Sequence, residues 1–234
     1  MKTLFAPAIA LLNRVGYTKK FAIMGALALV ASAVLVLNLY QSLYRVIDRS
    51  QQELAGVEMI KPIARVVQYL QVHRGLSSGV LSGNEEMKEQ RAAKEKEVSA
   101  AFKAVTARLA PELAASTAWK TAVEAWALLD KEGLDLIQRE NFLAHNRLID
   151  DLLAFQAAIA DQYALTNDPD IDSAYLIDTA VDKLPQALER MGQLRALGTG
   201  VLSRKQALVL SQQVEFTVLL AELNASVNGL RRNL

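Results

Sequence analysis

Apolar residues recur at steps of three or four along most of this chain, which is the spacing of one face of an α-helix. The clearest run lies between Arg45 and Ser82, with apolar positions at Leu54, Val57, Ile60, Ala64, Val67 and Leu70. The same spacing predicts further helices over about 85–109, 112–131, 141–165, 172–204 and 205–234. The predicted fold class is therefore all-α, an elongated up-and-down helical bundle.

Proline and glycine predict where these helices bend or end. Gly83 and Asn84 offer a helix stop followed by an N-cap, so a helical hairpin is expected at 83–84. Pro62 removes one backbone donor and predicts a kink. Pro111 predicts an interruption of the helix that follows the hairpin.

Two polar stretches predict solvent-exposed or turn structure. The alternating charges of Glu85–Val98 are typical of a solvated helix face with weak ion pairs. Residues 166–170 form a turn by composition, after which Asp172 or Ser173 is the expected N-cap of the next helix.

The N-terminal 20 residues differ in charge from the rest of the chain. They contain the cations Lys2, Arg14, Lys19 and Lys20 and no acidic residue. This pattern predicts that 1–20 is an amphipathic segment on the cytoplasmic membrane surface.

Residues 21–44 contain no charged side chain and are long enough to cross the roughly 30 Å apolar core of a bilayer. They predict one transmembrane helix, with the N-terminus in the cytoplasm by the positive-inside rule and 45–234 on the other side. A cleaved signal peptide is the alternative, because Ala31-Ser32-Ala33 is an acceptable cleavage site. The apolar run continues past that site, which favours an uncleaved anchor.

Composition excludes several functional classes. The 234-residue chain has a net charge of +1, which gives no basis for nucleic-acid binding. It has no cysteine and only two histidines, His73 and His145, so we expect no metal site, no cofactor and no enzyme activity. Each histidine is expected on the surface or at a helix interface. Trp119 and Trp126 share a helix face and are expected to pack in the core rather than hold a ligand.

A short internal repeat is the one constellation that resembles a binding site. Arg74–Ser82 aligns with Arg195–Ser203, and six of nine positions are identical. Each copy combines one arginine, a rigid fork of donors for planar oxyanions, with glycines and hydroxyl side chains. The predicted ligand-binding residues are Arg74, Ser77, Ser78, Arg195 and Thr199, and the predicted ligand is a small anion.

The alternative is architectural. Small residues in the repeat would then serve close helix crossing, and each arginine would pair with an acid such as Asp178, Asp182 or Glu189.

The segment Leu70-Gln71-Val72-His73-Arg74-Gly75-Leu76-Ser77-Ser78-Gly79 resembles the Leu-Gln-x-Glu-Arg-Gly-x-Ser signature of nitrate- and nitrite-sensing (NIT-type) helical domains. Only Arg74 and its neighbours fall on that signature, and His73 stands where it usually has Glu. The N-terminal segment and Asp168–Leu176 are similar to bacterial membrane receptors: chemotaxis receptors, histidine kinases and diguanylate cyclases.

The resemblance implies a periplasmic sensory domain, 45–234, anchored in the bacterial inner membrane. It further implies a homodimer and a cytoplasmic signalling module in a longer receptor, of which this chain would be a truncated part. The rival hypothesis is a membrane-anchored structural or interaction protein that binds no small molecule.

Overall fold

The computed structural model describes residues 16–167, 170–204 and 207–233, and these residues form helices and turns without a strand. The all-α prediction is confirmed. The interfacial segment expected within 1–20 and the expected helix start at Lys205 lie largely or wholly outside the described residues. The chain divides into two compact units, Met1–Gln51 and Gln52–Leu234.

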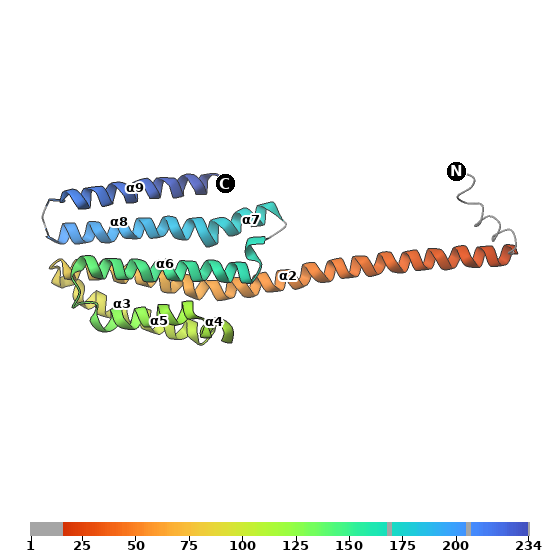
Figure 1. The fold of residues 1–234 in the computed structure, drawn as a ribbon, viewed down its shortest axis with the longest axis horizontal. Coiled ribbons are helices and arrows are strands. Elements are labelled where there is room, and N and C mark those ends of the chain that lie inside the picture. The colour runs from red at the N-terminus through yellow and green to blue at the C-terminus, as the bar shows by residue number, and fades with distance from the viewer. Residues whose placement is uncertain (1–15, 168–169, 205–206, 234) are drawn as a thin grey trace. The chain divides into compact units, whose positions relative to one another are not determined.

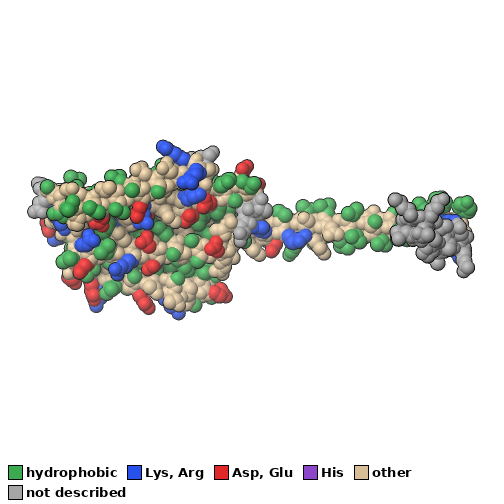
Figure 2. Space-filling model, turned by 45° about the horizontal axis from the view of Figure 1, so that its top comes forward, with side chains coloured by type: hydrophobic (Ala, Val, Ile, Leu, Met, Phe, Trp, Pro, Cys, Tyr) green, Lys and Arg blue, Asp and Glu red, His purple; other side chains and the backbone are tan. Residues whose placement is uncertain are grey.

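The first unit contains the beginning of helix α2 (Tyr17–Leu81). Its apolar segment near the N-terminus is long and apolar enough to cross a membrane, and none of that segment is buried. Figure 2 shows hydrophobic side chains distributed along this part of the helix. The α-helix also continues through Pro62 without interruption.

The second unit is built of antiparallel helices that follow one another up and down (Figure 1). After α2 come η1 (Glu85–Met87), α3 (Lys88–Thr106), α4 (Pro111–Ala115), α5 (Thr117–Glu132), α6 (Gln138–Gln162), η2 (Leu165–Asn167), α7 (Ile171–Ile177), the π-helical η3 (Asp178–Lys183), α8 (Leu184–Arg204) and α9 (Leu210–Arg231).

The main core lies among α2, α3, α5 and α6. Trp119 and Trp126 are buried there, and both rings contact Phe102, as expected for packing residues. A smaller cluster joins α6 to α8 and α9 through Phe142, Leu197 and Leu219. Helices α8 and α9 therefore attach to the main core through α6, beside α2.

Helix ends follow local chemistry, with two corrections. The hairpin prediction is confirmed: Gly83 has a φ of +97°, and the Asn84 side chain accepts from the N–H of Glu86. The helix expected over 112–131 is broken at Ser116, whose hydroxyl caps α5 by accepting from the N–H of Trp119. The N-cap of α7 is Asp170 rather than Asp172 or Ser173, and Asp172 donates its N–H to the Asp170 carboxylate.

The charged stretch Glu85–Val98 is not a uniformly solvated face. Arg91 is buried, donates to Ser77 and forms a 2.7 Å ion pair with Glu95. Its position in α3, directly against α2, gives it two fixed acceptors that offset its loss of hydration.

Candidate functional site

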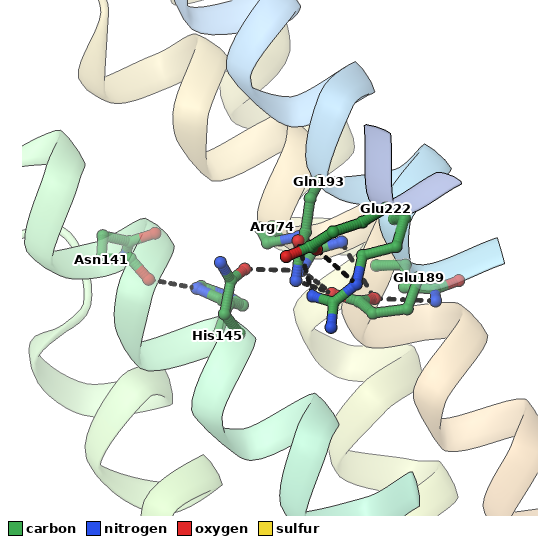
Figure 3. Close-up of polar contacts among 9 residues, drawn as sticks. Arg74, Asn141, His145, Glu189, Gln193 and Glu222 are labelled. Carbon is green, nitrogen blue, oxygen red and sulfur yellow. Dashed lines mark hydrogen bonds and ion pairs between the residues drawn. The ribbon is translucent and has the colours of Figure 1, made fainter. Parts of the chain in front are cut away.

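The guanidinium of Arg74 is completely buried where α2, α6 and α8 meet. Its Nη1 donates to Glu189 of α8 and, at 2.6 Å, to the side-chain oxygen of Asn146 of α6. Its Nη2 donates to the second Glu189 oxygen at 3.1 Å. Figure 3 shows this two-point contact, which is the fork geometry that arginine forms with a carboxylate.

Glu189 is held by more than the arginine. Gln71 of α2 donates to it at 3.0 Å, and Gln193 donates to it at 2.8 Å from one turn further along α8. These extra donors are what a buried carboxylate requires, since the attraction within an ion pair scarcely offsets the loss of hydration of both charges. The acid partner that the architectural alternative expected is therefore present for Arg74.

Two donors beside this ion pair are left without partners. The Nε of Arg74 and the hydroxyl of Ser78 are buried and have no hydrogen-bond partner in the part of the chain that the structure describes. Because residues four apart lie above one another on a helix, both belong to one face of α2. Unpaired buried donors are rare in proteins, and together they could bind an acceptor-rich group such as an oxyanion.

Gly192 lies against Arg74 and also lines a surface groove that is formed by residues of α2, α6 and α8. A Cβ built on Gly192 would lie 2.8 Å from Nη2 of Arg74, so any larger residue at 192 would require the buried guanidinium to shift. Gly192 and Arg195 both line the groove, and Arg195 is exposed there. Of the two arginines of the repeat, Arg74 is therefore buried beside Gly192, whereas Arg195 is exposed in the groove.

The other predicted site residues have different environments. Ser77 is buried and accepts from Arg91 Nε at 3.1 Å, and the Thr199 hydroxyl donates to the backbone oxygen of Arg195 at 2.9 Å. The methyl group of Thr199 lies 3.3 Å from where a Cβ on Gly79 would be. Ser77 and Thr199 therefore contribute to helix contacts, whereas Ser78 has an uncommitted hydroxyl.

His73 and His145, which are far apart in sequence, form a buried pair at the interface of α2 and α6. Their ring nitrogens are 2.9 Å apart, and His145 Nδ1 lies 2.8 Å from the backbone oxygen of Asn141. Because only an N–H can face that oxygen, Nδ1 of neutral His145 carries the proton, and its Nε2 accepts from His73. Burial lowers the pKa of His73 to about 2 and that of His145 to about 4, so both rings are neutral at pH 7. The interface expectation is confirmed for both.

Some residues of this site carry no clear sequence signal. Gln71 falls on the Gln of the NIT-type signature, but Asn146 and Gln193 are ordinary polar residues in helical patterns. Only their contacts with Arg74 and Glu189 distinguish them. A weak signal exists in the spacing, because Glu189 and Gln193 are four residues apart on α8.

The comparison with protein families bears directly on this site. A family model described as nitrate and nitrite sensing (NIT) matches residues 65–233, which is more than half of the chain. The chain belongs to the NIT family. The matched region of this NIT domain contains the whole Arg74–Glu189 cluster, both histidines and every groove-lining residue except Ala64. No curated protein and no solved structure matches the chain.

Proposed function

We propose that this NIT domain detects a small oxyanion, nitrate or nitrite, and passes the signal to a transmitter through rearrangement of its helices. The family match supports the class of ligand. The observation that carries the site assignment is the buried Arg74, whose Nε and neighbouring Ser78 hydroxyl have no partner among the described residues.

The geometry suggests how binding changes the structure. Arg74 is on α2 and Glu189 on α8, so the ion pair ties these two helices together. An oxyanion that binds the same guanidinium competes with Glu189 and is repelled by it. Binding therefore favours an arrangement in which α8 has moved relative to α2. The free energy by which the anion shifts this equilibrium is no larger than the difference between its binding free energies for the two arrangements. Arg195, in the groove wall, attracts the anion from solvent.

The apolar segment of α2 supports a membrane-anchored sensor. We place the N-terminus in the cytoplasm and the NIT domain on the periplasmic side of a bacterial inner membrane, on the basis of the N-terminal cations. The transmitter is a cytoplasmic module, and the chain itself acts as a sensor rather than an enzyme.

Matched glycine variants test the site. The full chain in lipid nanodiscs is titrated with nitrate, nitrite and acetate by calorimetry. Gly192→Ala places a methyl group against Arg74, so we expect nitrate affinity to fall by tenfold or more. Gly198→Ala is the control, because it lies on the same helix with nothing within 4 Å of the added Cβ, and it should bind as the parent does.

Arg195→Ala removes an exposed cation that attracts the anion and is expected to weaken nitrate binding about fivefold, since a nearby charge in contact with water contributes about 1 kcal/mol. Equal affinity in the parent, Gly192→Ala and Arg195→Ala proteins would overturn the site assignment. Failure of the parent chain to bind any of the three anions would overturn the sensing proposal.

A further inference from the structure

The groove between α2 and α8 is too large for the anion proposed above. Its volume is about 510 Å³, within the range of roughly 300–1,000 Å³ that small-molecule sites occupy. Its walls are mostly apolar, with Val67 and Val72 from α2, Leu188 and Met191 from α8, and Leu153 from α6. A planar anion of four atoms would leave most of this surface without contacts.

One end of the groove carries a free positive charge. The Arg195 guanidinium is exposed there and forms neither a hydrogen bond nor an ion pair within the described part of the chain. Arginine presents two parallel donors that match a carboxylate. This end is therefore suited to an anionic group.

The opposite end carries an unpaired acceptor. Gln156 of α6 lines the groove and is 1% exposed. Its Nε2 donates to the backbone oxygen of Val181 at 3.4 Å. In an α-helix that oxygen would accept from the N–H of residue 185, but residue 185 is proline and has no N–H. The contact with Val181 favours the amide orientation described, because the flipped amide would set oxygen against oxygen. The Gln156 Oε1 that remains is buried and has no hydrogen-bond partner among the residues that the structure describes.

We infer that this groove binds an elongated carboxylate with an apolar chain and a hydrogen-bond donor at its far end. The carboxylate contacts Arg195, the chain lies against Val67, Leu188 and Met191, and the donor reaches Gln156. Pro185 and Arg195, at the two ends, are ten residues apart on α8, or about 15 Å at 1.5 Å per residue. The inference does not depend on nitrate sensing, because the ligand differs in size and class.

Photo-crosslinking locates such a ligand. Decanoate with a diazirine in its chain is irradiated with the full chain in nanodiscs, and the labelled peptides are mapped by mass spectrometry. We expect labelling of α2 and α8 residues in the groove wall. Leu188→Trp fills the groove and should reduce this labelling at least tenfold. Leu202→Trp should leave it unchanged, because Leu202 lies on the same helix, is 78% exposed and is outside the groove. Equal groove labelling in both variants would overturn the inference.

Competition tests the contact with Gln156. Decanoate with a hydroxyl on its terminal carbon should displace the label at about fivefold lower concentration than decanoate, the ratio given by one hydrogen bond of ~1 kcal/mol. Gln156→Leu should abolish that ratio, and a ratio that persists would overturn the donor assignment.

Two further readouts separate the explanations. The chain is labelled both as a self-associated species and after dilution to monomers. If the groove is labelled only in the monomer, a second copy of the chain covers the groove, and this result would overturn the small-molecule site. Nitrate titration of Leu188→Trp keeps the two proposals apart. Lost labelling with retained nitrate binding supports a separate groove site, whereas groove labelling without nitrate binding in the parent overturns only the sensing proposal.

Discussion

Arg74 and His73 are consecutive residues of α2, yet they face different partners, and both are fully removed from water. Arg74 pairs with Glu189 across to α8, whereas His73 pairs with His145 across to α6. Removing one member of a buried ion pair typically costs about 3–5 kcal/mol, because the remaining charge is left without compensation. This short stretch of α2 is therefore specified by polar contacts as well as by apolar packing.

The histidine pair predicts that stability depends on pH. Burial holds both pKa values below the ordinary 6.5, at about 2 for His73 and about 4 for His145. The unfolded chain therefore binds more protons than the folded chain as pH falls from 6.5 towards 4. The free energy of unfolding should decrease over this window by up to ~1.4 kcal/mol per pH unit for each histidine.

Urea unfolding followed by circular dichroism at several pH values measures this slope. His145→Gln keeps a hydrogen-bonding side chain but removes one titrating group. The slope of its free energy of unfolding against pH should therefore be smaller by up to ~1.4 kcal/mol per pH unit, the contribution of one proton. An unchanged slope in this variant would contradict the assignment of the pH dependence to the pair.

At the residue scale, the repeat predicts both Arg74 and Arg195 as ligand-binding residues and does not distinguish them. Their local sequences match at six of nine positions, so any rule based on the repeat treats them alike. Their environments differ because α6 and α8 cover Arg74, whereas Arg195 faces the open groove. Burial of this kind is decided by contacts between distant segments, which also explains why the meeting of His73 and His145 had no local signal.

At the scale of elements, apolar periodicity predicted most helices, and glycine predicted the hairpin at 83–84. The predicted helix ends are wrong at positions where two local sequence signals compete. Asp170 and Asp172 are both good caps, and the chain uses the earlier one. Ser116 lies within an apolar pattern that suggests one helix, but its hydroxyl starts a new one. Arg91 belongs to a charge run, and only the proximity of α2 explains its burial.

Pro62 gives a prediction for one element. The α-helix α2 continues through it, so the Glu58 backbone oxygen lacks the N–H that residue 62 would otherwise donate. Pro62→Ala restores this donor and should raise the free energy of unfolding by about 1–3 kcal/mol. Pro111→Ala is the control, since Pro111 occupies the first turn of α4, where no helical bond is lost. Urea unfolding measures the free energy of unfolding of both variants. Equal increases in Pro62→Ala and Pro111→Ala would contradict the explanation that the gain comes from a restored hydrogen bond inside a helix.

At the scale of the whole molecule, the described surface of the Gln52–Leu234 unit has an apolar strip along α9. Leu210, Val214 and Val218 are all about half exposed or more, at steps of four that place them on one helix face. Neighbouring apolar side chains of this kind mark interaction surfaces.

We therefore propose that the chain is a homodimer in which the α9 strip of each copy contacts the other. In a two-fold interface both copies contribute the same residues. A substitution to glutamate therefore places a negative charge on each side of the interface, and the two like charges repel one another. Val214→Glu with Val218→Glu should shift the chain in nanodiscs or detergent from dimer to monomer, measured by light scattering coupled to size-exclusion chromatography. Asn224→Glu adds one such charge on α9 outside the strip and should leave the dimer intact. A parent chain that is monomeric at micromolar concentration, or a double variant that remains dimeric, would contradict this interface.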